Sequence, residues 1–169
     1  TSLAGQAVNE AVVLDFKKRL NDVVDIDPDA QTVTAEPGIT LARLNDQLSE
    51  HGLKYAPDPA GADKRVLGGC IGNNTTGAHS LKYEKADGYL ESVEVVLADG
   101  TVTTFGWMDV AELHERAAGV TDDDGIKEQV YAVVSDVLQN KREAIEAKYP
   151  DLMRNVSGYN FDKLLEDAD

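Results

Sequence analysis

Two pairs of short β-rich runs, each pair divided by a turn, limit this chain to folds that contain antiparallel hairpins. Residues 91–97 and 101–105 form one pair, and Ala98-Asp99-Gly100 between them indicates a tight turn because glycine accepts the positive φ that such turns require. Residues 23–26 and 32–35 form the second pair around a turn that contains proline and aspartate. Strand-rich segments interleaved with a few helices favour an α+β fold over a doubly wound parallel sheet.

Apolar residues recur at helical spacing in other parts of the chain. Leu41, Leu44 and Leu48 predict an amphipathic helix over residues 40–51, with Thr40 as its cap and Gly52 as its stop. We expect the remaining elements to be a buried strand at 11–15, a short helix at 108–118, a longer helix with its apolar face at 126–145 that closes at Pro150, and a last helical turn at 163–165.

Two segments rich in small residues carry no long periodic pattern. One is residues 1–6, and the other lies within residues 55–89, which include Pro57-Asp58-Pro59 and the glycine-rich stretch 68–77. Glycine permits a close backbone approach, and Thr, Ser and Asn add hydroxyl and amide donors, so such loops can hold a pyrophosphate without Lys or Arg. The alternative is that both are ordinary turns. Neither contains the Rossmann or P-loop glycine pattern.

The charge balance excludes some partners. The sequence has 31 Asp and Glu against 16 Lys and Arg, a net charge of -15, which would repel nucleic acid and anionic membrane surfaces. The acidic residues are spread along the chain, which favours adaptation to high salt, with an acidic mesophilic protein as the alternative. Cys70 is the only cysteine, and the sequence shows neither a membrane span nor a signal peptide, so we expect a cytoplasmic protein.

Several motifs resemble one family of flavoproteins. Residues 1–6 and the Val-Val-Leu-Asp run that follows resemble the pyrophosphate loop of the FAD-linked oxidases related to vanillyl-alcohol oxidase and p-cresol methylhydroxylase, where Arg-Gly-Gly-Gly precedes it. Pro57-Asp58-Pro59 and Leu67–Gly77 resemble that family's second FAD segment in order and spacing. Residues 155–160, Asn-Val-Ser-Gly-Tyr-Asn, resemble a segment of its glycolate, D-lactate and D-2-hydroxyglutarate dehydrogenase branch.

This resemblance implies a fold and a set of cofactor-binding residues. The fold would be an incomplete FAD-binding domain of the p-cresol methylhydroxylase type, with an antiparallel-rich sheet and flanking helices. Residues 1–56 would end its first subdomain, residues 57–169 would belong to the second, and the final FAD motif and substrate domain are expected beyond Asp169. The residues implied for the pyrophosphate are Thr1, Ser2, Gly5 and Gln6, and those implied around the flavin and its linker are Pro57, Asp58, Gly68, Gly69, Asn73, Asn74, Thr75, Thr76 and Gly77.

The same resemblance implies a reaction. The intact protein would oxidise a small D-2-hydroxy acid by hydride transfer to FAD and pass the electrons to a separate acceptor. We expect the catalytic base outside these residues and the isolated fragment to be inactive. The substrate, the acceptor, the oligomeric state and any downstream iron–sulfur region stay open.

The alternative is a flavin-binding or nucleotide-binding module without turnover, or a domain that has lost its cofactor. It is motivated by Ala60, Gly61 and Val66, where the family usually has hydroxyl residues, and Glu84 also replaces a common glycine.

Other chemically notable residues favour structural roles. We expect His51 and His114 on the surface and Cys70 to be a packed small residue. His79 lies in the flavin segment, but loop histidines of this kind are common. Asp122-Asp123-Asp124 fits a helix N-terminus better than a calcium loop, and Arg154 and Tyr159 are candidates for facing an anionic substrate and the flavin, respectively.

Overall fold

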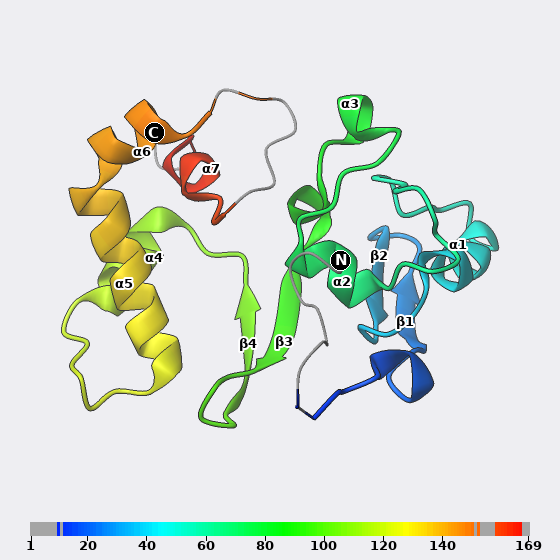
Figure 1. The fold of residues 1–169 in the computed structure, drawn as a ribbon, viewed down its shortest axis with the longest axis horizontal. Helices are drawn as coiled ribbons and strands as arrows, with labels where there is room; N and C mark the ends of the chain where they lie inside the picture. The colour runs from blue at the N-terminus through cyan, green and yellow to red at the C-terminus, as the bar shows by residue number, and fades with distance from the viewer. Residues whose placement is uncertain (1–9, 11, 151, 153–157, 167–169) are drawn as a thin grey trace. The chain divides into compact units, whose positions relative to one another are not determined.

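The chain folds into two compact units, residues 1–90 and 91–169. The structure is a computed structural model and describes residues 10, 12–150, 152 and 158–166 (Figure 1). In the first unit the elements are η1 (Phe16–Lys18), β1 (Val23–Asp27), β2 (Thr32–Ala35), α1 (Leu41–Ser49), α2 (Leu67–Gly72), α3 (Ser80–Tyr83) and η2 (Ala86–Tyr89). In the second they are β3 (Ser92–Val96), β4 (Val102–Gly106), α4 (Val110–Ala117), α5 (Ile126–Asn140), α6 (Arg142–Lys148) and α7 (Phe161–Glu166).

The first predicted hairpin is confirmed. Strands β1 and β2 pair antiparallel, from Val23 opposite Ala35 to Asp27 opposite Thr32. The turn forms because the Asp27 carboxylate accepts hydrogen bonds from the backbone N–H groups of Asp29, at 3.0 Å, and Ala30, at 2.9 Å. Asp at the start of a turn commonly satisfies the following amides in this way.

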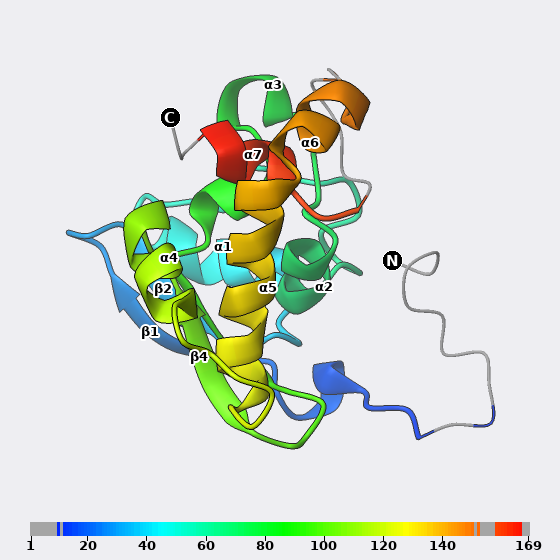
Figure 2. The ribbon, with the colours of Figure 1, turned by 90° about the vertical axis from the view of Figure 1, so that its left-hand side faces the viewer.

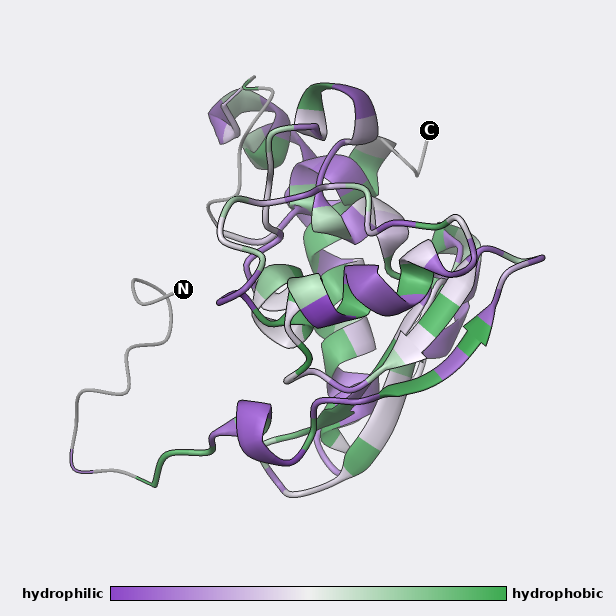
Figure 3. Cartoon of the chain, turned by 90° about the vertical axis from the view of Figure 1, so that its right-hand side faces the viewer, coloured by the Kyte–Doolittle hydropathy of each residue, from purple (hydrophilic) through white to green (hydrophobic). Residues whose placement is uncertain are grey.

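The predicted amphipathic helix is also confirmed and forms the core of the first unit. Leu41, Leu44 and Leu48 are buried on one face of α1, together with Ile39 and Cys70. Thr40 caps the helix because its hydroxyl accepts a hydrogen bond from the Arg43 N–H. Figure 3 shows how hydrophobic and hydrophilic residues alternate along α1 and the β1–β2 hairpin.

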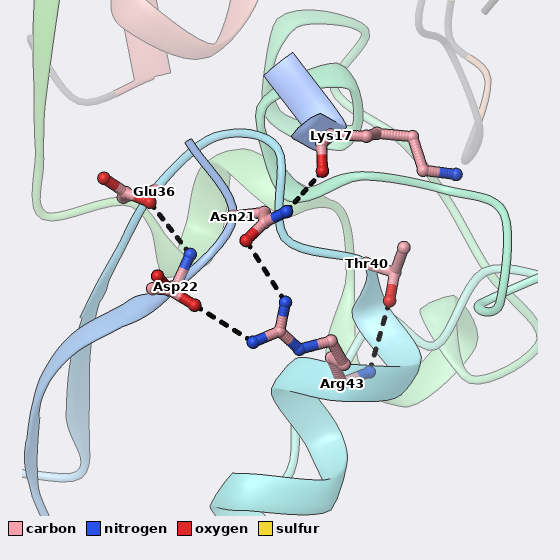
Figure 4. Close-up of polar contacts among 6 residues, drawn as sticks. All are labelled: Lys17, Asn21, Asp22, Glu36, Thr40 and Arg43. Carbon is pink, nitrogen blue, oxygen red and sulfur yellow. Dashed lines mark hydrogen bonds and ion pairs between the residues drawn. The ribbon is translucent and has the colours of Figure 1, made fainter. Parts of the chain in front are cut away.

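A polar network joins the start of α1 to the hairpin (Figure 4). The Arg43 guanidinium donates to the side chains of Asn21, at 3.2 Å, and Asp22, at 3.0 Å. The Asp22 N–H donates to the Glu36 carboxylate at 2.9 Å, and the Asn21 amide donates to the Lys17 carbonyl. Because Arg43 and Asp22 are about half or more exposed, this network sets register more than it adds stability.

Residues 55–89 contain no long helix or strand, as predicted, but they do form the short helices α2, α3 and η2. The start of α2 runs against the turn before α1. The Leu67 N–H donates to the Ile39 carbonyl at 3.0 Å, and the Gly68 N–H donates to the Pro37 carbonyl at 2.9 Å. These contacts fix the glycine-rich segment on the core of its own unit.

The second unit confirms the other hairpin and packs helices around its own core. Strands β3 and β4 pair antiparallel from Ser92 opposite Gly106 to Val96 opposite Val102, and Gly100 takes the expected positive φ of 85°. Helices α4 and α5 lie side by side (Figure 2). The buried residues they share with the elements that follow are Leu113, Tyr131, Leu138, Ile145 and Leu165.

Three local predictions are wrong. Residues 12–15 form no strand, and Val12 is 90% exposed, because no described strand pairs with them. The helix predicted through residue 145 breaks at Lys141, where φ is -122° and the chain leaves the helical region between α5 and α6. His114 is half-buried rather than on the surface, because it hydrogen-bonds to α5.

The mixture of helices and antiparallel strands is confirmed, but the strands of the described residues form two separate two-stranded sheets. Within these residues, no helix is long and apolar enough to cross a membrane.

Candidate functional site

The structure gathers the described part of the predicted site in the first unit. Thr1, Ser2, Gly5 and Gln6 lie outside the described residues. The other predicted residues fall into two short stretches, Pro57-Asp58 and 68–77. These two stretches contact each other. Some of their residues pack within the loop, and others are exposed on its surface.

The two stretches cross at Gly77. The Ala78 N–H donates to the Asp58 carbonyl at 3.3 Å, while Pro57 is fully buried and Asp58 adopts a positive φ of 45°. A Cβ atom added to Gly77 would lie 1.8 Å from the Pro57 carbonyl oxygen and 2.4 Å from that of Asp58. Glycine is therefore required at position 77 by the backbone crossing itself.

The glycines of α2 divide into two kinds. A Cβ on Gly68 would lie 2.7 Å from the Pro37 side chain, so this glycine serves the packing of α2 on the core. A Cβ on Gly69 would meet only Val66, at 3.5 Å, and a Cβ on Gly72 would meet nothing within 4 Å. Gly69 and Gly72 are exposed, and nothing within the described residues requires glycine at either position. They leave bare backbone on an open surface, which another molecule can approach closely.

Most backbone amides that follow α2 already have partners within the chain. The N–H groups of Asn73, Asn74 and Thr75 donate to carbonyls of α2, and the Gly77 N–H donates to the Ser80 hydroxyl at 2.7 Å. Thr75 is itself buried. These amides therefore build the loop through contacts within the chain.

Asn74 is held by a residue that the sequence reasoning missed. Its side-chain amide donates to the Asp87 carboxylate at 2.7 Å, and its side-chain oxygen accepts from the Asp87 backbone N–H at 3.0 Å. Asn74 has a positive φ of 45°, which asparagine tolerates better than most residues. The sequence signal for this pair was faint, because Asp87 lies 13 residues beyond Asn74 in a separate short helix.

Asp58 is the centre of a small ionic cluster. Its carboxylate lies 3.0 Å from the Lys54 ammonium and 3.0 Å from Nδ1 of His79. The hydrogen bond from Lys54 holds the pKa of Asp58 below its ordinary value, and His79 acts in the same direction. Asp58 therefore stays ionised and orients the ring of His79, which is exposed.

Burial controls the chemistry of Tyr55, just before this loop, and of Cys70 in α2. Cys70 is 2% exposed, and burial raises the pKa of its thiol, so it is a packed protonated residue and not a nucleophile, as predicted. Burial also raises the pKa of Tyr55 to about 12, and its hydroxyl is a buried polar group without a hydrogen-bond partner in the described structure. The Tyr55 phenol therefore stays neutral at physiological pH.

The segment around the loop is less acidic than the rest of the chain. Residues 53–85 contain five Lys and Arg against three Asp and Glu, within a chain whose net charge is -15. An anionic ligand would meet less repulsion here than elsewhere on the surface.

The remaining candidates that the structure describes lie in the second unit. Nδ1 of His114 is hydrogen-bonded to the buried Ser135 hydroxyl, at 2.7 Å, and lies 3.1 Å from the Gln139 amide. Asp124 caps the turn before α5, where its carboxylate accepts from the Thr121 N–H at 2.7 Å, while Tyr159 is 80% exposed and Arg154 lies outside the described residues. In the described part of the chain, no three His, Cys, Asp or Glu side chains gather as a metal site requires.

Comparison with known proteins matches this chain to flavoproteins. The model of a family described as "FAD binding domain" matches residues 1–106. D-2-hydroxyglutarate dehydrogenase of Escherichia coli K12 is 28% identical over 167 residues, which are 99% of this chain and 16% of that protein. D-lactate dehydrogenase of Archaeoglobus fulgidus is 37% identical over 108 residues, or 63% of this chain and 24% of that protein.

A third relative, the glycolate oxidase subunit GlcD of Bacillus subtilis, is 34% identical over 102 residues, or 60% of this chain and 22% of that protein. The chain spans only 16% of the length of the D-2-hydroxyglutarate dehydrogenases of Escherichia coli and Pseudomonas putida. The family match covers more than half of the chain and includes residues 1–6 and 57–77, two of the three segments that carry the sequence resemblance. The chain therefore belongs to the FAD binding domain family.

Proposed function

We propose that the loop formed by residues 57–77 contacts FAD. The contact is made by the exposed backbone of α2 and by Thr76, which follows the amides that donate to α2. The observation that carries this proposal is the bare backbone at Gly69 and Gly72, where a side chain would meet open space or only an ordinary contact. Thr76, half-buried at the end of the loop, adds a neutral hydroxyl on the same segment. The other predicted residues hold this surface in place.

The donors present suit a dinucleotide cofactor. Backbone, hydroxyl and amide groups bind neutral polar edges and phosphate oxygens without requiring an ion pair. The slight excess of basic residues over 53–85 reduces the repulsion of the cofactor's phosphates by this acidic chain. We further propose that Thr1, Ser2, Gly5 and Gln6 bind the pyrophosphate, as the family resemblance implies.

For the whole protein, we propose the oxidation of a small D-2-hydroxy acid. FAD supplies the hydride acceptor when it is bound, and the residues of this chain bind and orient it. The names of the relatives, which act on D-2-hydroxyglutarate, D-lactate and glycolate, support this class of substrate. The same proposal includes a separate electron acceptor, an FAD-binding fold of the p-cresol methylhydroxylase type, and a division of this fold between residues 56 and 57. The single cysteine supports a reducing cytoplasmic location, and the acidic composition supports adaptation to high salt.

The second candidate is a module that binds a flavin without turnover or has lost its cofactor. Ala60 and Gly61 motivate it, because both are exposed in the loop and neither provides a hydroxyl group. The two candidates differ in the spectrum of the protein. A flavoprotein enzyme purifies yellow or takes up FAD and bleaches anaerobically with D-lactate, glycolate or D-2-hydroxyglutarate, whereas a module without turnover keeps its colour.

The binding surface is tested by titrating FAD into the purified protein and into the variants Gly69→Ala and Gly72→Ala, following flavin fluorescence. We expect each methyl group to weaken binding by about tenfold, because it separates the backbone from the cofactor. Gly106→Ala is the matched control, since its Cβ would meet only ordinary contacts at 3.7 and 3.8 Å in the second unit. Affinities equal to that of the control would refute the placement of FAD on α2, and a protein that takes up no FAD would refute the proposal as a whole.

A further inference from the structure

Asn74 and Asp87 form a reciprocal pair that closes the loop after α2. The amide of Asn74 donates to the Asp87 carboxylate at 2.7 Å, and the Asn74 side-chain oxygen accepts from the Asp87 N–H at 3.0 Å. Both residues are half-buried. Each side of the pair therefore has a donor matched to an acceptor, a geometry that fixes the position and orientation of Asn74.

Asp87 is itself held firmly. Its other carboxylate oxygen accepts from the Gly88 N–H at 2.9 Å, the Lys85 ammonium lies 4.0 Å away, and the neighbouring Ala86 is 2% exposed. Asn74, by contrast, lies in a strained backbone region with φ at 45°. The anchored carboxylate thus adds to the stability of this conformation through the two hydrogen bonds with Asn74.

That conformation determines where the loop residues lie. The Asn74 N–H donates to Ile71 and the Thr75 N–H donates to Cys70, both at 2.9 Å, so the turn continues directly from the end of α2. Thr76 and Gly77 follow from the same turn. A shift at Asn74 would move the hydroxyl of Thr76 relative to the exposed backbone of Gly72.

We propose that Asp87 is a positioning residue for cofactor binding, which acts through Asn74 and does not touch the cofactor. The inference rests on the proposed FAD surface at α2 and extends that surface by a residue outside the segment 57–77. The expected change in FAD affinity on removal of the Asp87 carboxylate is opposite to the change that electrostatics alone predicts. Removing a carboxylate beside an anionic cofactor would by charge alone strengthen binding, whereas loss of the pair would weaken it.

The test is a side-chain exchange that preserves charge. Asn74→Asp places two carboxylates face to face and breaks the pair. Adding Asp87→Asn restores a donor opposite an acceptor, keeps the backbone hydrogen bond and returns the total charge of the pair to its original value. Aspartate also tolerates the positive φ at position 74. Asp87→Ala removes the pair outright, and Asp63→Ala, an exposed aspartate in the same segment, controls for loss of charge.

Two readouts separate positioning from direct contact. FAD affinity is measured by fluorescence titration, and hydrogen exchange of the amides of residues 73–77 is measured without FAD. We expect Asn74→Asp and Asp87→Ala to weaken FAD binding by about tenfold and to speed exchange, while the double variant returns both to within about threefold of wild type. Asp63→Ala should leave affinity unchanged or slightly higher.

Restored exchange without restored affinity in the double variant would overturn the proposal, because the Asn74 amide would then bind the cofactor itself. Wild-type affinity in Asp87→Ala would overturn it as well. If the wild-type protein takes up no FAD, the proposed function and the role of Asp87 in cofactor binding both fail, and the exchange rates alone then decide whether the pair holds the loop.

Discussion

The substitution Gly77→Ala tests most directly whether the loop is built as described. The added Cβ would lie 1.8 Å from the Pro57 carbonyl oxygen, whereas an ordinary non-bonded contact is about 3.5 Å. The two segments would have to separate by about 1.5 Å or more. Pro57 is fully buried, so this separation cannot be absorbed at the surface.

The loss in free energy of unfolding caused by Gly77→Ala has two contributions. Overpacking at a buried site costs about 1–3 kcal/mol, and loss of the hydrogen bond from Ala78 to Asp58 adds about 1 kcal/mol. We therefore expect Gly77→Ala to lower the free energy of unfolding by roughly 2–4 kcal/mol, which is a large fraction of the total for a typical domain. The expected result is a clearly lower urea midpoint by circular dichroism, or poor recovery of folded protein.

Gly72→Ala is the matched comparison, because its Cβ meets open space. At the end of α2 alanine is the better helix former, so the free energy of unfolding should stay equal or rise by up to about 1 kcal/mol. Equal midpoints for wild type and Gly77→Ala would refute the backbone crossing at Gly77. A large loss in Gly72→Ala would show that the surface of α2 is not open.

Three further predictions concern burial and charge. Between about pH 10 and 12 the phenol of Tyr55 ionises in the unfolded chain but not in the folded one, so its contribution to stability is present below pH 10 and falls by about 1 kcal/mol per pH unit above it. Tyr55→Phe should reduce that slope in urea unfolding and be neutral or stabilising near pH 7, and an unchanged slope would contradict the buried hydroxyl. Ser135→Ala removes a buried hydroxyl that is hydrogen-bonded to His114 between α4 and α5, so we expect the free energy of unfolding to fall by about 1 kcal/mol in thermal unfolding, and wild-type stability would show that this hydrogen bond adds nothing. Because the net charge is -15, unfolding measured against KCl should show stability that rises from low to molar salt, and a flat profile would argue against adaptation to high salt.

Patterns within a few residues predicted the local elements well. The turn at Asp99-Gly100 and the leucine spacing of α1 depend on backbone geometry and on side chains one helical turn apart, so the sequence is enough to place them. The prediction for residues 12–15 was wrong for a related reason. An apolar run forms a strand only when another strand pairs with it, and the run itself carries no information about its partner.

The family motifs located the segment that forms the site. They did not show which of its glycines are required for packing and which are exposed. Gly68, Gly69, Gly72 and Gly77 look alike in the sequence. In the structure, Gly68 faces Pro37 and Gly77 meets the backbone of Pro57 and Asp58, whereas Gly69 and Gly72 face open space or a single ordinary contact. Which of these glycines serves packing depends on residues 19 or more positions away, and no local sequence pattern reports contacts over that separation.

The sequence by itself thus determined the hairpins, the amphipathic helix and the membership in a family that binds FAD, because each follows from short-range spacing or from an ordered set of motifs. Tertiary structure alone decided that Gly77 lies against Pro57, that the Tyr55 hydroxyl is buried, and that Asp87 holds Asn74. The physical reason is that burial and the pairing of buried polar groups depend on which distant segments meet, and only the folded chain brings those segments together.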